Sequence, residues 1–336
     1  MNQKILIVYN TCGLDCGTDH NIKNRDNTDW YIECIQSLLD QKYDNQHVVW
    51  SSCFNKPEHR AKLKNHFGSR ISYNFIDTVA ISVFGTFNHS VKRCEEHISQ
   101  FDAYFYIDSG VKFQRPDIVL ETNKLLANKD NAIICLTADT DNGFSDFPQL
   151  PQSFPFEDHY IMPVGTYLRA HTTCYARCLL DTYGVPAPDI FASFFTEAPH
   201  TYMAAGLGKN VIIHKDAFTL HRVGSQAVDG ASLGFPNLPT TNPRPRWDHT
   251  LGNKNMIDII SDPEAWECGF GYEIYSPETG AGAGIEHFPH NPECWENNKC
   301  KDPERLKRFL IDNIFLKPEE VDYNSLPNEF IPGDCI

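Results

Sequence analysis

The chain has 336 residues, of which 41% are hydrophobic and 22% are charged. This is the composition of an ordinary globular protein, and the length suits one large domain with an extension, or two domains. A formal net charge of −15 argues against nucleic-acid binding, because neutralising phosphates takes clustered Lys and Arg. No uncharged apolar run of about 18 residues is present, so we expect no membrane-spanning helix.

The opening residues, MNQKILIVYNTCG, favour a first buried strand over a signal peptide, because the apolar run is short and ends in polar residues. The twelve cysteines include no CxxC pair, and the tightest pairs, such as Cys12 and Cys16, are four residues apart. Zinc sites usually carry paired ligands at closer spacing. We therefore expect reduced thiols that act as small apolar residues in a cytoplasmic protein.

Predicted strands and helices alternate over the first part of the chain. Apolar runs predict strands, and stretches with helical periodicity separate them. The predicted strands are residues 4–9, 46–50, 71–76, 103–107 and 132–136, and the predicted helices are residues 30–39, 55–67, 90–99 and 116–127. This alternation indicates an α/β fold with a mainly parallel central sheet.

The rest of the chain is less regular. Residues 142–160 are predicted to form a loop, helices are predicted at 171–183 and 197–207, and a strand is predicted at 210–213. After residue 225 Gly, Pro and Asn dominate. There, one further helix is predicted at 302–316, with Asp302 as its N-cap and Pro303 at its first position.

Polar residues that follow strands are the first candidates for function, because ligands of such sheets bind beyond the carboxyl ends of the strands. Asp108 ends the apolar segment YFYIDSG, where a carboxylate can hold a divalent ion or a ribose hydroxyl. A solvated Asp that starts a turn is the alternative. Asn10 and Thr11 end the first strand and can receive a base or a ribose.

Two further residues could carry chemistry. Glu197 stands at a predicted helix start, where it can serve as a general base or simply stabilise the helix dipole. His221 ends a predicted strand and can ligate a metal or contact a diphosphate, with Arg222 beside it to offset phosphate charge. An ordinary polar cap is the alternative for His221.

Four segments carry short motifs in a fixed order. Residues 30–43 resemble the form YL…SLL.Q.Y, with Ile32 in place of the Leu, and residues 104–110 fall where a DXD motif would stand. Residues 196–197 fall where an ED pair would stand, and residues 208–221 resemble the ending G..I.......DA...H. In this order they resemble the family 2 glycosyltransferases of the GT-A fold, over roughly residues 4–222.

The resemblance implies a Rossmann-like GT-A domain over residues 1–225, with helices on both faces of its sheet, and an irregular extension, 226–336, packed on that core. It implies an inverting hexosyl- or pentosyltransferase that moves a sugar from a nucleotide-diphosphate-sugar to a glycan or other hydroxyl acceptor. Glu197 would be the base, Asp108 and His221 would hold Mn²⁺ or Mg²⁺, and a lipid-linked acceptor would be met peripherally at a membrane. Donor contacts would come from Asn10, Thr11, Ser52, Asn88, Asp108, Ser109 and Arg222, and acceptor contacts from His171 and Trp247.

Two positions depart from the family pattern. Gly110 replaces the second acid of the DXD motif, so metal binding would rest on Asp108 with His221, or be weak or absent. Ser51, Ser52 and Asn55 stand where the second strand often carries an acid that reads the base. The identity of the nucleotide therefore stays open.

The sequence also bears on two other functions, a nucleotidyltransferase and a catalytically inactive relative. A nucleotidyltransferase would need a phosphate loop rich in Gly and Lys, but residues 10–18 contain no Lys or Arg. The main alternative is a catalytically inactive relative that binds carbohydrate or nucleotide, with Gly110 marking lost metal chemistry. Aromatic residues of the extension, Trp247 among them, could form an acceptor cleft or serve only in packing.

Overall fold

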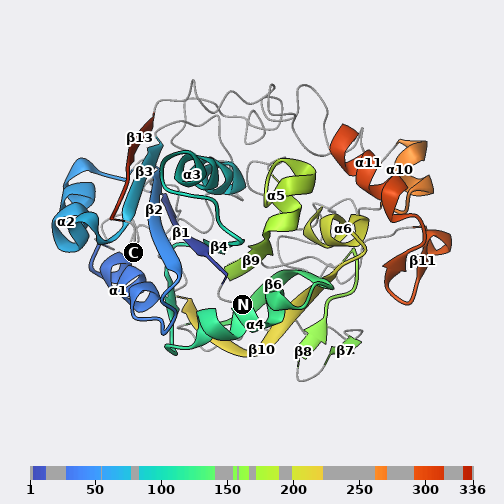
Figure 1. The fold of residues 1–336 in the computed structure, drawn as a ribbon, viewed down its shortest axis with the longest axis horizontal. Helices are drawn as coiled ribbons and strands as arrows, with labels where there is room; N and C mark the ends of the chain where they lie inside the picture. The colour runs from blue at the N-terminus through green and yellow to red at the C-terminus, as the bar shows by residue number, and fades with distance from the viewer. Residues whose placement is uncertain are drawn as a thin grey trace, which may run out of the picture.

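A computed structural model of the chain describes residues 3–12, 28–53, 55–76, 83–140, 154–156, 159–165, 172–188, 199–221, 262–270, 291–313 and 328–334. Its main sheet is built in the order β13-β3-β2-β1-β4-β9-β6-β10-β8-β7, with β5 paired to β10 (Figure 1). The strands are β1 (Ile5–Cys12), β2 (Gln46–Cys53), β3 (Ser72–Ile76), β4 (Ala103–Ile107), β5 (Val111–Phe113), β6 (Asn131–Thr140), β7 (Phe154–Phe156), β8 (His159–Ile161), β9 (Thr172–Ala176), β10 (Asn210–His221) and β13 (Asn328–Ile331).

Helices flank this sheet, and a small hairpin lies apart from it. The helices are α1 (Thr28–Leu39), α2 (Pro57–Phe67), α3 (Val83–His97), α4 (Ile118–Ala127), α5 (Arg177–Tyr183), α6 (Pro199–Gly206), α10 (Pro263–Glu267) and α11 (Pro303–Asn313), with 3-10 turns at Gly68–Arg70 and Pro292–Cys294. The hairpin consists of β11 (Trp295–Glu296) and β12 (Lys299–Cys300). None of the described helices is long and apolar enough to cross a membrane.

The centre of the sheet is mainly parallel, as predicted. Strands β3, β2, β1 and β4 run parallel, and so do β6 and β10. Strand β9 is antiparallel to both β4 and β6, so β4 and β6 share a direction. All central strands except β9 therefore end at the same edge, and the predicted α/β class is confirmed.

The helix predicted at 171–183 is wrong in its first part. Thr172–Ala176 form β9, and only Arg177–Tyr183 are helical. Residues 172–175 are all buried, because β9 lies between two strands and both of its faces are covered. Continuous burial leaves no alternation in the sequence that distinguishes a strand from a short helix.

Alternating side chains of the strands build two cores, one on each face of the sheet. Leu6 and Val8 of β1 pack in a cluster with α3, α5, α6 and α11, which we call the α3 face. Ile5, Ile7 and Tyr9 pack with α1, α2 and α4, on what we call the α1 face. Helices thus cover both faces, as expected, and Figure 1 shows α3 and α5 on the side of the sheet opposite α1 and α4.

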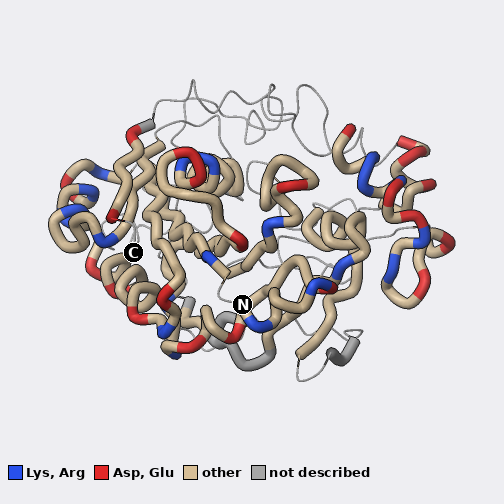
Figure 2. Tube along the Cα trace, viewed as in Figure 1, with Lys and Arg blue, Asp and Glu red and all other residues tan. Residues whose placement is uncertain are grey.

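Five strands of this sheet carry no charged residue. Strands β1 to β4 and β9 contain no Lys, Arg, Asp or Glu, and Figure 2 shows charged residues mostly on the helices and turns. Strands buried on both faces are expected to be apolar throughout. A polar side chain within these strands therefore needs a specific explanation.

Segments beyond residue 225 join the main sheet and one of its cores. Strand β13 pairs antiparallel with β3, with Phe330 opposite Asn74. Helix α11 buries Leu306 and Phe309 in the α3-face core. The Oδ1 atom of Asp302 accepts a hydrogen bond of 3.0 Å from the backbone N–H of Arg305, which confirms the predicted N-cap. The division of the chain at residue 225 stays a prediction.

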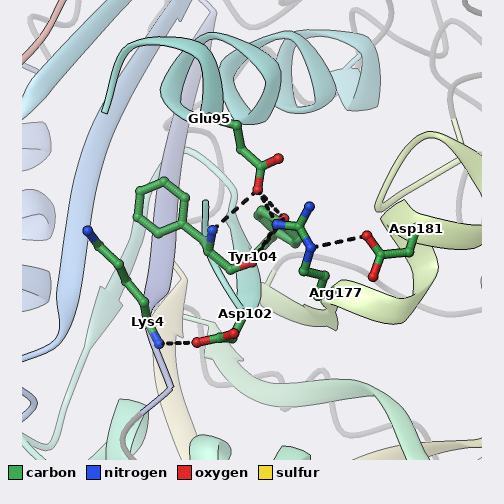
Figure 3. Close-up of polar contacts among 7 residues, drawn as sticks. Lys4, Glu95, Asp102, Tyr104, Arg177 and Asp181 are labelled. Atoms are coloured by element: carbon green, nitrogen blue, oxygen red, sulfur yellow. Dashed lines mark hydrogen bonds and ion pairs between the residues drawn. The ribbon is translucent and has the colours of Figure 1, made fainter. Parts of the chain in front are cut away.

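The edge of the sheet at the start of β1 and β4 is held by ion pairs (Figure 3). Arg177 Nη1 donates to Glu95 Oε1 at 2.7 Å, which ties α5 to α3, and Arg177 Nε donates to Asp181 Oδ1 at 3.1 Å within α5. Tyr104 Oη also donates to Glu95, and burial raises the pKa of Tyr104. The backbone N–H of Lys4 donates to Asp102. These polar groups bind one another, so the contacts at this edge hold the fold together.

Buried His47 should make the fold sensitive to acid. Its side chain is 4% exposed, and its Nε2 atom lies 2.8 Å from the hydroxyl of Ser72, which also accepts the N–H of Gly333. Ser72 then donates to a neutral His47. Desolvation and the charge of Lys4 lower the pKa of His47 to about 4.

We predict that this contribution to stability is complete above the unfolded pKa of about 6.5 and is lost as the pH falls towards 4. Between pH 7 and pH 4.5 the loss should be about 2 to 3 kcal/mol, because only the unfolded chain binds the proton readily. Urea unfolding at both pH values, on the wild type and on His47→Gln, measures it. An identical pH dependence in the two proteins would contradict the assignment.

Candidate functional site

The carboxyl ends of β1, β2 and β4 lie side by side. In the parallel register Asn10 is opposite Ser51, and Thr11 is opposite Ser52. Tyr9 is opposite Ile107, so Asp108 follows β4 next to the end of β1. The structure thus brings together four of the predicted donor-site residues, at the edge where α/β sheets bind ligands.

These four residues divide between the two faces of the sheet. Asn10 follows Val8 by two positions and lies on the α3 face, where Tyr106 Oη also donates to Asp108 Oδ1 at 3.3 Å. Thr11 lies on the α1 face, where Trp50 Nε1 donates to its hydroxyl at 2.8 Å. The site is therefore two polar groups of different chemistry, one on each side of the strand ends.

Asn10 is the most unusual of these residues. Its side chain is 6% exposed, and neither Oδ1 nor Nδ2 has a hydrogen-bond partner among the described residues. A buried polar group left without a partner costs about 1 to 3 kcal/mol. Other buried polar atoms also lack partners among the described residues, but Asn10 is the side chain for which both amide atoms do, so both are available to hydrogen-bond a ligand at this edge.

The turn after β4 is held in a conformation that favours glycine. Gly110 has a φ of 86°; its N–H donates to Tyr9 Oη at 3.1 Å, and its carbonyl accepts from Trp30 Nε1 at 3.2 Å. Burial raises the pKa of Tyr9, which keeps its hydroxyl protonated. An acidic side chain at position 110 would be strained at this φ, which gives a physical reason for the missing second acid.

Backbone pairing brings the two predicted metal ligands to one region. His221 is the last residue of β10 and is opposite Val111 of β5, three positions after Asp108. Asp108 is half-buried, and its Oδ1 accepts the N–H of Ser109 at 3.0 Å. Carboxylate oxygen suits Mg²⁺ or Mn²⁺, and imidazole is a ligand for several transition metals. Within the described ranges, no group of three or more His, Cys, Asp or Glu could hold a metal ion.

The remaining predicted residues are placed only in part. Ser109 is buried in the turn. Asn88 of α3 is buried and donates to the carbonyl of Ala187 at 2.9 Å, while its Oδ1 has no partner among the described residues. The Nδ2 atom of Asn88 is thus used within the fold, and its Oδ1 atom is available to a ligand. Glu197, Arg222, His171 and Trp247 lie outside the described residues.

Two residues of this edge, Trp50 and Arg60, were missed in the sequence, and Asn55 was noted there only for the acid that it replaces. Trp50 donates to Thr11, and Thr11 in turn donates to Asn55 Oδ1 at 2.8 Å. Ser52 also donates to Asn55 Oδ1 at 2.8 Å, and Arg60 Nε donates to Ser52 at 3.3 Å. We call these five residues the Asn55 network.

No protein-family model matches the sequence, and no curated protein matches it. Among solved structures, the chain resembles the mannosyltransferase PcManGT from Pyrobaculum calidifontis in complex with GDP-Man and Mn²⁺, at 11% identity and a TM-score of 0.42 over 66% of this chain and 57% of that one. It resembles S. aureus TarS at 12% identity and a TM-score of 0.48, over 78% of this chain and 46% of that one. It also resembles S. aureus TarS 1–349 in complex with UDP-GlcNAc, at 12% identity and a TM-score of 0.49, over 78% of this chain and 82% of that one.

The chain is thus an α/β protein with a polar site at the carboxyl edge of its sheet. The chain spans just over half of the mannosyltransferase and under half of the longer TarS chain. Likeness at this identity and TM-score concerns the arrangement of elements, and the function has to be argued from the site.

Replacing the unpartnered amide of Asn10 should stabilise the chain without ligand. We predict that Asn10→Leu, which keeps the branched shape, raises the free energy of unfolding by about 1 to 2 kcal/mol, because two unsatisfied polar atoms disappear. Urea unfolding measures the change.

Thr11→Val is the matched control on the next residue. It removes a buried hydroxyl whose hydrogen bonds are made, so it should destabilise the protein by about 1 to 2 kcal/mol. If Asn10→Leu destabilised the protein as much as Thr11→Val does, Asn10 would have partners and the ligand argument would fail.

Proposed function

We propose that the chain is a glycosyltransferase that binds a nucleotide-diphosphate-sugar across the carboxyl ends of β2, β1 and β4 and passes the sugar to a hydroxyl acceptor. The main support is the buried, unpartnered amide of Asn10 at this edge, beside Asp108. An amide offers a donor and an acceptor together, which suits a base or a ribose. A glycan is the proposed acceptor, and a lipid-linked one would be met at a membrane surface by this cytoplasmic protein.

The charge of Asp108 sets how the diphosphate can bind. A carboxylate repels a diphosphate unless a cation lies between them. Asp108 and His221 are the residues that would hold Mn²⁺ or Mg²⁺, and the bound ion would neutralise the leaving diphosphate. Arg222 would add a second positive charge. Ser109 and Asn88 would complete the donor contacts from the α3 face.

Glu197 is the proposed base. It would remove the proton of the acceptor hydroxyl while that oxygen attacks the anomeric carbon, with inversion and departure of the nucleoside diphosphate. Helix α6 begins two residues after Glu197 and packs on the α3 face, the face that carries Asn10 and Asp108. His171 and Trp247 are proposed as acceptor contacts.

A catalytically inactive relative that binds nucleotide or carbohydrate is the second candidate. The observation that favours it is the positive φ of Gly110, which disfavours the second acid of a metal site. Such a protein would bind the donor through the same edge residues and would neither hydrolyse nor transfer the sugar.

A panel of nucleotides tests donor binding directly. We predict that one of UDP, GDP, CDP or TDP, or its sugar conjugate, raises the unfolding temperature, and that the rise needs Mn²⁺ or Mg²⁺, because a ligand that binds only the folded state stabilises it. Asn10→Leu should abolish the rise. A rise that survives EDTA would remove the ion from the proposal, and no rise with any nucleotide would refute the proposed function.

Glu197→Gln tests the chemistry. We expect turnover to fall by about two to four orders of magnitude, because general-base catalysis is lost, while the nucleotide-dependent thermal shift stays as in the wild type. Product release from the donor measures turnover. Turnover that survives the change would refute the base assignment, and a wild type that binds donor but never turns it over would support the inactive relative.

A further inference from the structure

Helix α6 is enclosed on every side. All of its residues are buried, from Pro199 to Gly206, and none of them is charged. A helix that is buried all round needs cover on both of its sides. The sheet covers one side, and Figure 1 shows α6 between the sheet and α11, which belongs to the part of the chain beyond residue 225.

Three parts of the chain beyond residue 225 pack directly on α6. The ring of Tyr202 contacts those of Phe270 and Trp295, with centroids 4.7 Å and 6.0 Å apart. At Gly206 the helix approaches α11 so closely that a Cβ atom there would lie 3.3 Å from the Cα atom of Lys307. The position of α6 therefore depends on this part of the chain as well as on the sheet.

The hairpin of β11 and β12 ends in a two-residue turn that binds another segment. Asn297 and Asn298 have φ values of 50° and 62°, a conformation that Asn tolerates better than most residues. Asn298 Oδ1 accepts the N–H of Val164 at 2.7 Å, and Asn298 Nδ2 donates to the carbonyl of Met162 at 3.1 Å. One amide thus binds two backbone groups of this segment, as a neighbouring strand would.

The segment that Asn298 binds is joined in turn to the start of α6. The N–H of Gly165 donates to Thr201 Oγ1 at 3.0 Å. Thr201 lies in the first turn of α6 and is buried. The hairpin therefore reaches α6 by two routes, directly through Trp295 and indirectly through Asn298, residues 162–165 and Thr201.

The first turn of α6 is also fixed to the sheet. His200 Nε2 lies 2.8 Å from Tyr175 Oη of β9, and the ring of Phe84 in α3 contacts that of His200 at 5.0 Å between centroids. Strand β9 pairs with β4, the strand that leads to Asp108. Contacts from the sheet and from the hairpin thus together set the place of this turn relative to the ligand edge.

We propose that the β11–β12 hairpin is a positioning element for catalysis, which fixes the first turn of α6 and through it the base, with Asn298 as the positioning residue. This rests on the proposed function, in which Glu197 is the base, and only Ala198 separates Glu197 from α6. A base must lie within hydrogen-bond reach of the proton that it removes, so a small displacement lowers the rate and leaves donor binding intact.

Asn298→Asp and Asn297→Asp are matched variants, because they make the same change at the two positions of one turn. In Asn298→Asp a carboxylate oxygen replaces the N–H donor to Met162. Within the described part of the chain, Asn297 has no side-chain hydrogen bond to residues 162–165. Asn298→Gly keeps the positive φ and removes both hydrogen bonds without adding a charge.

Release of nucleoside diphosphate is measured with UDP-glucose, UDP-GlcNAc, GDP-mannose, CDP-glucose and TDP-glucose, with water or a methyl glycoside as acceptor. For the donor that the wild type uses, we expect kcat to fall about ten- to a hundredfold in Asn298→Asp and in Asn298→Gly, with the KM for the donor unchanged. Asn297→Asp should match the wild type. Urea unfolding midpoints show that each variant is folded.

Thr201→Val tests the indirect route, because it removes the acceptor of the Gly165 N–H. If the hairpin acts through Thr201, combining Thr201→Val with Asn298→Asp should lower kcat no further than the larger single effect. Fully additive losses would overturn the proposal, as would an unchanged kcat in Asn298→Asp or an equal loss in Asn297→Asp, and the proposed function would then stand. A wild type that releases no nucleoside diphosphate from any donor would overturn both.

Discussion

The parallel pairing of β1 with β2 on one side and β4 on the other is the constraint on which the site depends. Because the three strands run in the same direction, their last residues meet at one edge, and residues about one hundred positions apart become neighbours. No charged residue is needed within the strands to achieve this. The helices then only have to cover the two faces, and the polar groups collect where the strands end.

Alternation along β1 gives the site its two chemistries. Asn10 continues the α3 face, and Thr11 continues the α1 face. The first has no partner for its amide, and the second is tied into a saturated network. The end of β1 thus supplies Asn10, whose amide can bind a ligand, and Thr11, whose hydroxyl already binds Trp50 and Asn55. A shift of register by a single residue would exchange the two.

The sequence was most informative where a residue's place follows from its own strand. Asn10, Thr11 and Asp108 could be predicted as neighbours, since apolar runs end at them and an α/β sheet aligns such ends. The hydrogen bonds of Asn55 reach a partner 44 positions away, and β9 is hidden by its continuous burial. The conformation of Gly110 depends on hydrogen bonds to Tyr9 and Trp30, 101 and 80 positions away. Local pattern carries no signal for such contacts.

The outer edge of the sheet has a consequence for how the chain folds. Strand β13 covers β3, and the N–H of Gly333 binds Ser72 across a separation of 261 positions. Closing so long a loop is slow, because its entropy is lost before the contacts form. Until β13 docks, β3 presents unpaired backbone groups that another chain could join. During synthesis this edge stays unpaired until the residues between β3 and β13 have been made.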